Sequence, residues 1–145
     1  MREARSLPKR EQVFVLSLMY HGYRVTKKRT GLKKKKGYIC CSTKREDASG
    51  VDFWVKMPGS MRMFPIQVTQ RGVAIFRERN KRHTESQLQE FVERSEQRLR
   101  RKRVMCRRNH VAFVLVRDHS HGSLSTSLAW GDVKALRFAL ERLHP

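Results

Sequence analysis

Long hydrophobic runs and a cysteine framework are both missing from this chain of 145 residues. No stretch approaches the roughly 20 apolar residues that a membrane span needs. The basic N-terminus and the apolar run 13–19 are not followed by a small-residue cleavage site, so we expect no signal peptide. Cys40, Cys41 and Cys106 are odd in number, and two are adjacent, which excludes a disulfide framework. These absences predict a cytoplasmic protein with reduced thiols.

Acidic residues are scarce. The chain has 13 Asp and Glu against 33 Lys and Arg, a formal net charge of +20 at pH 7. Self-repulsion at this charge destabilises a compact state unless a polyanion relieves it. Phosphate contacts with counterion release make DNA or RNA the expected partner, and an anionic membrane surface the weaker alternative.

Several catalytic signatures are missing as well. The sequence has no glycine-rich phosphate loop, no Gly-x-Ser-x-Gly and no His-Glu-x-x-His. His119 and His121 have the spacing of metal ligands, but no cysteine or histidine cluster near them would complete a zinc site. Neither an internal repeat nor a linker is present, so residues 1–145 are expected to form one domain.

Apolar periodicity and turn residues predict an α/β fold, a small mixed sheet flanked by helices in the order α-β-β-β-α-β-α. The first helix is expected to start near Ser6 and Pro8 and to stop before Gly22. A capping box at Thr84 and Gln87 starts the second, which runs to about residue 108. The last helix is expected over 133–143, preceded by Trp130-Gly131-Asp132.

The expected strands are bounded by turn residues and rich in β-branched and aromatic side chains. The run 110–117 is apolar throughout, which predicts a central strand buried on both faces. Residues 44–50 and 118–127 are expected to be loops. Strands are expected over 23–26, 38–43, 51–56, about 62–70 and 110–117, where 38–43 is either a second strand or a continuation of the first.

Basic side chains gather in a loop, 27–37, and at a helix end, 98–108. We expect both to contact phosphates, although a solvated loop and a solvated helix face are the alternatives. The candidate contacts are Lys27, Lys28, Arg29, Lys33, Lys34, Lys35 and Lys36 in the loop, and Arg100, Arg101, Lys102 and Arg103 in the helix.

Polar residues interrupt two of the expected strands. Asp52 lies in an apolar run, and an unpaired buried acid is costly, so a functional role is favoured. Gln67 and Thr69 are two apart and therefore share one face, with Ile66 and Val68 on the other. We expect Gln67 and Thr69 to face Asp52 across the sheet.

The order and spacing of these residues resemble the PD-(D/E)xK nuclease superfamily, which has the restriction-endonuclease-like fold, and within it the small archaeal Holliday-junction resolvases. In that pattern a Glu on the first helix precedes a Gly and an aromatic-x-Val strand, as Glu11 precedes Gly22-Tyr23-Arg24-Val25. An Asp then opens the next core strand, as Asp52 does. The third strand carries an acid, an apolar residue and a Lys, where this chain has Gln67-Val68-Thr69. The resemblance covers about residues 8–117.

This resemblance implies a Mg²⁺- or Mn²⁺-dependent endodeoxyribonuclease that acts on branched or structured DNA as a homodimer. It implies catalytic roles for Glu11, Asp52, Gln67 and Thr69. Asp52, Gln67, Glu11 and the Val68 backbone carbonyl would be the metal ligands. Without the resemblance, Glu11 is expected to be a charge at a helix start. Glu46 and Asp47 are expected to shape the turn before a strand, with membership of the site as the alternative.

Two departures from the pattern affect the chemistry. The Gln67 carbonyl is a neutral oxygen ligand that a hard cation accepts. Thr69 cannot supply the positive charge of the usual Lys. Alternation places Lys56 on the face of Asp52 and Arg71 on that of Gln67, so both are candidates for this charge and for phosphate contact. The alternatives to a nuclease are a catalytically degenerate nucleic-acid-binding protein on the same fold and a basic RNA-associated protein.

Overall fold

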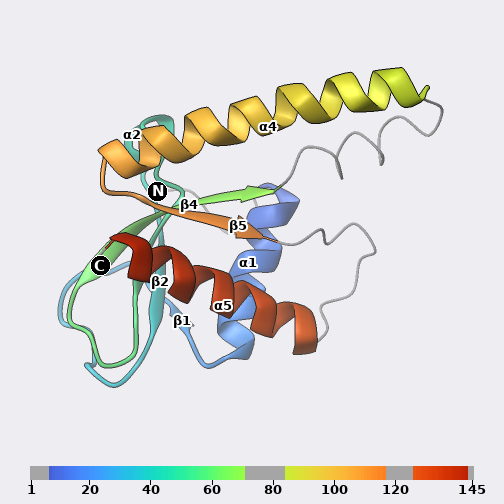
Figure 1. The fold of residues 1–145 in the computed structure, drawn as a ribbon. Coiled ribbons are helices and arrows are strands. Elements are labelled where there is room, and N and C mark those ends of the chain that lie inside the picture. Colours follow the sequence, from blue (N-terminus) through green and yellow to red (C-terminus); the bar gives the residue numbers. More distant parts are fainter. Residues whose placement is uncertain (1–6, 71–83, 117–125, 144–145) are drawn as a thin grey trace.

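Five strands form one mixed sheet in the order β1-β2-β3-β4-β5. The structure is a computed structural model that describes residues 7–70, 84–116 and 126–143 (Figure 1). The middle pairs, β2 with β3 and β3 with β4, are antiparallel, and the two outer pairs are parallel. The strands are β1 (Arg24–Val25), β2 (Tyr38–Cys41), β3 (Phe53–Lys56), β4 (Met63–Gln70) and β5 (Ala112–Val116).

Helices cover both faces of this sheet. α1 (Lys9–Tyr20) and α5 (Thr126–Leu143) pack on one face, and α4 (Glu85–Arg108) lies along the other (Figure 1). Alternation along β3 divides its side chains between the two layers. Phe53 joins Phe14 of α1 and Leu136 of α5 in the main core, whereas Trp54 packs against a smaller cluster that contains Cys106 of α4. Phe14 and Phe53 are fully buried, and burial of each contributes about 1.5–3 kcal/mol.

Local sequence signals explain the predicted helices. α4 starts where its capping box predicted: Thr84 Oγ1 accepts a hydrogen bond from the Gln87 N–H at 3.1 Å, and Gln87 Oε1 accepts one from the Thr84 N–H at 3.1 Å. It ends at Arg108, also as predicted. α1 ends before Gly22, whose φ of 87° is a conformation that glycine adopts without strain. Pro8 occupies the position before the first residue of α1, and Ser6 lies outside the described residues.

The segment before β3 differs from its prediction. Residues 44–48 form a short helix, α2 (Lys44–Ala48), rather than part of a loop. A second capping box explains it: Thr43 accepts from the Glu46 N–H at 3.2 Å, and Glu46 accepts from the Thr43 N–H at 2.9 Å. In addition, β1 and β2 are separate parallel strands, so the order of elements in the described residues becomes α-β-β-α-β-β-α-β-α.

Two predictions near the C-terminus were wrong. β5 is an outer strand of the described sheet and not a central one. The run is apolar because α4 covers one face of β5 and α5 covers the other. Such a run indicates that both faces of a strand are covered, and it does not indicate that other strands pair along both of its edges. α5 begins at Thr126 rather than at residue 133, and it includes Gly131 and Asp132.

The predicted α/β class, a mixed sheet flanked by helices, is thus confirmed, and the restriction-endonuclease-like topology stays a prediction. Residues 118–125 of the expected polar loop, including His119 and His121, lie outside the described part of the chain. Within the described ranges, none of the helices combines the length and the apolar character required to cross a membrane.

Candidate metal centre

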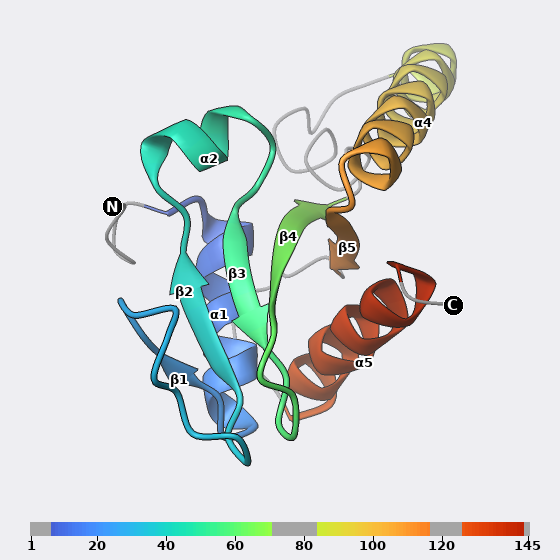
Figure 2. The ribbon, with the colours of Figure 1, turned by 90° about the vertical axis from the view of Figure 1, so that its left-hand side faces the viewer.

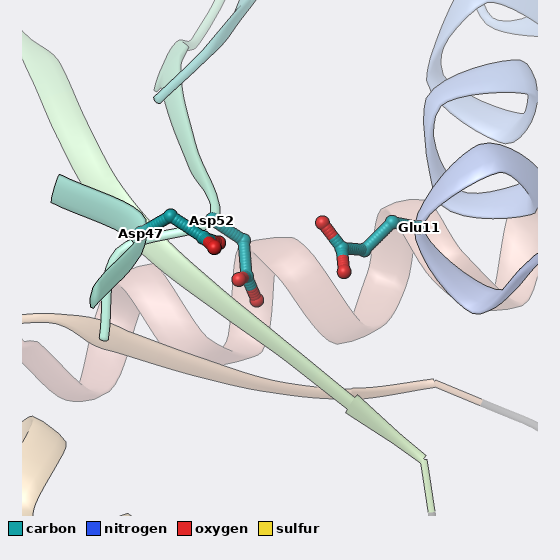
Figure 3. A group of neighbouring side chains, drawn as sticks. All are labelled: Glu11, Asp47 and Asp52. Carbon is teal, nitrogen blue, oxygen red and sulfur yellow. The ribbon is translucent and has the colours of Figure 1, made fainter. Parts of the chain in front are cut away.

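Three carboxylates meet at the end of the sheet where the central strand β3 begins. Glu11 comes from the first turn of α1, Asp47 from α2, and Asp52 from the residue before β3. One oxygen atom of each lies within 4.8 Å of the others. Figure 3 shows the carboxyl groups of Glu11 and Asp52 directed toward each other, with Asp47 beside Asp52. Glu11 and Asp52 are buried and Asp47 is half-buried.

A tight turn after α2 brings Asp47 back to Asp52. The Gly50 N–H donates to the Asp47 carbonyl at 3.1 Å, and the Val51 N–H donates to the Glu46 carbonyl at 3.0 Å. Gly50 has a φ of 94°, which strains any residue with a Cβ atom. The Asp52 N–H then donates to the Ile66 carbonyl on β4 at 2.8 Å, so the turn is attached to the sheet.

The surroundings of the Asp52 carboxyl group have opposing effects on its pKa. Its Oδ2 accepts a hydrogen bond from the Val68 N–H at 2.8 Å, which favours the carboxylate. Burial, together with the charge of Glu11 and the hydrogen bond and charge of Asp47, outweighs this and raises the pKa of Asp52 from 3.8 to about 7. Near neutral pH the three groups therefore favour an added proton or a cation.

The residues of β4 that the sequence singled out lie on the two faces predicted for them. Ile66 and Val68 are fully buried in the main core, and continuing the β3–β4 register places Gln67 opposite Asp52. The Gln67 Nε2 donates to the Val68 carbonyl at 3.4 Å, so the amide already contacts the carbonyl expected to bind metal. Gln67 Oε1 lies 3.9 Å from where a Cβ on Gly50 would be, which places it against the Asp47–Asp52 turn.

Thr69 is buried, and its Oγ1 makes no hydrogen bond with the described residues. It therefore has an unused donor and acceptor on the same face of β4 as Gln67. Arg71, the cation expected on this face, lies outside the described ranges.

The phosphate contact predicted for Lys56 is wrong, because its side chain has a structural role. Its side chain is buried, and Nζ donates to the carbonyl oxygens of Lys36 at 2.6 Å, Lys34 at 3.0 Å and Met57 at 3.3 Å. It also lies at the far end of β3, about 13 Å along the strand from Asp52 at ~3.3 Å per residue. Lys56 therefore holds the basic loop in place and cannot supply the charge that Thr69 lacks.

Arg29 is likewise engaged within the molecule. Its Nη1 donates to Glu46 Oε2 at 2.7 Å and its Nη2 donates to Glu46 Oε1. The guanidinium also stacks over Trp54, 4.8 Å from the ring centroid. The hydrogen bond from Arg29 lowers the pKa of Glu46 to about 2. This contact ties the basic loop to α2, the helix that carries Asp47.

The other expected phosphate contacts are accessible. Lys27, Lys28, Lys33, Lys34 and Lys35 are exposed in the loop, and Lys36 is half-buried. Arg100, Arg101, Lys102 and Arg103 are all exposed on α4. Apart from Arg29 and Lys56, the predicted contacts in the described ranges therefore present their charges at the surface.

Asp47 is the site residue that the sequence predicted to shape a turn, with membership of the site as the alternative. Two local signals point to it: the capping box at Thr43 and Glu46, which makes Asp47 helical, and Gly50, which turns the chain back. Neither signal indicates that the turn lies beside Glu11, because that depends on how α1 packs.

Comparisons of the chain with protein-family models, with curated proteins and with solved structures each gave no match. The resemblance to the PD-(D/E)xK superfamily therefore depends on residues of this chain alone, and a functional assignment depends on the geometry around Asp52.

Proposed function

We propose that the protein is a Mg²⁺- or Mn²⁺-dependent endonuclease that hydrolyses phosphodiester bonds in DNA, with branched or otherwise structured DNA as its substrate. The observation that carries this is the convergence of Glu11, Asp47 and Asp52 in a chain of net charge +20. Surfaces that bind polyanions gain nothing from three clustered acids, because carboxylates repel phosphates. A divalent cation between them would reverse that effect.

The donor set fits such a cation. Mg²⁺ and Mn²⁺ prefer carboxylate oxygens, and Mg²⁺ binds few protein ligands and keeps several waters. The three oxygens lie within 4.8 Å of one another. Around a Mg²⁺ ion with bonds of ~2.1 Å, oxygens are ~3.0 Å apart when adjacent and ~4.2 Å apart when opposite, so the carboxylates would move somewhat closer together to bind one ion.

When bound, the cation would neutralise phosphate charge and lower the pKa of a water. The chain's own residues would position the substrate. Asp52 is oriented by the Val68 N–H, and Asp47 by the turn through Gly50. The Thr69 hydroxyl would orient a water or a phosphate oxygen, and the basic loop and α4 would hold the flanking phosphates.

A second candidate function, a nucleic-acid-binding protein without catalysis, is favoured by Thr69. The hydroxyl carries no charge, and Lys56 points its ammonium group at three carbonyls. Unlike Lys56, Arg10 does place a cation beside the carboxylates, with its Nη2 3.7 Å from Glu11 Oε2. Both candidates predict nucleic-acid binding, so only cleavage separates them.

Cleavage of labelled single-stranded, duplex, flap, four-way-junction and RNA substrates with Mg²⁺ or Mn²⁺ tests the proposal. We expect Asp52→Asn to reduce metal-dependent cleavage at least about 100-fold and to retain binding. Glu93→Gln, which makes the same charge change at an exposed position of α4, should leave cleavage unchanged. Binding without cleavage under either metal would instead establish the non-catalytic function, and cleavage of RNA alone would overturn the DNA assignment.

A further inference from the structure

A cavity lies beside β5, the outer strand of the described sheet. It has a volume of about 230 Å³ and opens between α4, β5 and α5. Its apolar wall includes Cys106 of α4, Phe113 and Leu115 of β5, and Phe138 and Leu143 of α5. Figure 2 shows β5 as the outermost strand, with the C-terminal end of α4 on one side of it and α5 on the other.

The same cavity is strongly basic. Arg103 and Arg107 of α4 and Arg142 of α5 line it. None of the three forms an ion pair with an acid in the described part of the chain. The C-terminal ends of the two helices contribute about half a negative charge each, so three guanidinium groups leave the rim positive. The cavity therefore suits an anion that has an apolar body.

Two aromatic rings indicate that this body is flat. Arg103 stacks over Phe113 with its guanidinium carbon 5.4 Å from the ring centroid, and Arg142 stacks over Phe138 at 5.5 Å. Phe138 is 60 % exposed, so its ring is accessible to a ligand that enters the cavity. Rings and guanidinium planes of this kind are the surfaces on which nucleobases stack.

The cavity is close to the candidate metal centre. The β4–β5 register pairs Gln67 with Phe113. Cys106, Trp54 and Phe113 belong to one apolar cluster with Val51, the residue before Asp52. The cavity wall is thus separated from Asp52 by the single strand β4, on the face that α4 covers.

We propose that this cavity receives an unpaired nucleotide of the bound nucleic acid, with its base against Phe113 and Phe138 and its phosphate at Arg103, Arg107 and Arg142. The inference rests on the proposed nucleic-acid substrate and deepens it by naming the class: nucleic acid with an unpaired nucleotide near the bound phosphodiester. A paired base would have to be extruded at the cost of its stacking and pairing, whereas an unpaired base enters without that cost.

Binding to two matched duplexes tests this. One contains a single unpaired 2-aminopurine, and the other is fully paired with the same sequence. Affinity and 2-aminopurine emission are measured with EDTA at fixed salt. We expect the wild type to bind the bulged duplex about tenfold more tightly, in the range that base–aromatic stacking provides. Phe138→Ala should abolish this preference and leave affinity for the paired duplex within about twofold, because Phe138 is exposed and contributes little to the core.

A charge variant provides an independent readout. Arg142→Gln should weaken binding of the bulged duplex more than that of the paired duplex. Arg137→Gln removes the same charge from an exposed position of α5 outside the cavity, where the side chain stacks over Trp130. It should affect the two duplexes equally.

Equal affinity of the wild type for the two duplexes would overturn the inference, and so would an equal loss on both in Phe138→Ala. A dimer, seen by light scattering, that Phe138→Ala dissociates would overturn it too, since the face would then join two copies of the chain. The measurement needs no metal and no cleavage, so a preference for the bulge without nuclease activity would refute only the proposed catalysis.

Discussion

At the scale of single residues, opposing effects of the surroundings act on the ionisation of Asp52. The Val68 N–H favours its ionised form, whereas burial and the neighbouring acids Glu11 and Asp47 favour the neutral form. The second effect is larger and raises the pKa from 3.8 to about 7. The folded state therefore binds this proton more tightly than the unfolded state, and without a cation the unfolding free energy falls as pH rises from about 4 to 7.

Asp52→Asn should remove this penalty. Asn keeps an oxygen acceptor for the Val68 N–H but cannot ionise, so the unfolding free energy at pH 8 should rise by up to about 4 kcal/mol, at ~1.4 kcal/mol per pKa unit for a shift from 3.8 to about 7. Near pH 4 both forms are neutral and the gain should vanish. Urea unfolding at pH 4 and pH 8 with EDTA measures it, and an equal effect at the two values would contradict the assigned shift.

A metal titration of the wild type and Asp52→Asn tests metal binding at the site independently of cleavage. Mn²⁺ or Mg²⁺ at 100 times its dissociation constant should stabilise the wild type by about 2.7 kcal/mol. The effect should be small in Asp52→Asn and intact in Glu93→Gln. Equal stabilisation of all three proteins would place the cation elsewhere.

At the scale of elements, the basic loop is fastened at two points. Arg29 pairs with Glu46 of α2, and Lys56 Nζ holds the carbonyls of Lys34 and Lys36. α2 has only five residues, too few to form a helix without such support. Glu46 serves both sides, since it completes the capping box and accepts from Arg29. The loop and the turn that carries Asp47 are therefore mechanically connected.

Glu46→Gln should separate these two roles. Gln keeps an acceptor for the cap but loses the ion pair with Arg29, so trypsin should cleave within 27–36 several times faster. The loss of stability should stay below about 1 kcal/mol, because the pair is partly exposed. Cleavage mapped by mass spectrometry measures this. Glu90→Gln, which removes an exposed pair with Arg94, is the control and should leave the loop sites unchanged.

The pH dependence of this contact follows from the lowered pKa of Glu46. Since Arg29 lowers it from 4.5 to about 2, the stabilisation is present above about pH 4.5 and is lost as pH falls toward 2. The pH dependence of stability due to Glu46 is opposite to that due to Asp52, although both residues flank one turn. Burial among acids and exposure beside a guanidinium account for the difference.

At the scale of the whole molecule, the exposed surface is rich in bases and poorer in acids than the composition alone implies. Glu11, Asp52 and Asp132, three of the 13 acids, are buried, whereas most of the predicted phosphate contacts in the described ranges are exposed. The exposed bases of α4 lie on a helix of 24 residues. At ~1.5 Å per residue it is about 36 Å long, comparable to one turn of duplex DNA.

Removing three of these bases should change the salt dependence of binding. For Arg100→Gln/Arg101→Gln/Lys102→Gln, the slope of log K against log salt should become shallower by up to about 3, at ~0.9 per phosphate contact. Lys33→Gln/Lys34→Gln/Lys35→Gln should act in the same direction. Fluorescence anisotropy from 50 to 300 mM salt, about the range in which such slopes are measured, gives the slope. An unchanged slope in both triple variants would exclude these segments as the phosphate contacts.

The features predicted correctly are those with short-range causes. The capping box at Thr84 and the apolar stripe predicted α4 to its last residue. Alternation predicted the opposite faces of Gln67 and Val68. By contrast, Gly131 suggested a boundary that α5 does not have. The burial of Asp132 there depends on Ser17 of α1, whose Oγ donates to it at 2.6 Å across 115 residues of sequence.

The sequence by itself determined the charge, the helix starts and the side-chain alternation, because each depends on composition or on residues a few positions apart. Only the tertiary structure decided that Asp47 joins Glu11 and Asp52, that Lys56 binds carbonyls, and that β5 lies at an edge beside a basic cavity. These features depend on contacts between α1, α2, β3, α4 and α5, and such distant contacts leave no local pattern in the chain.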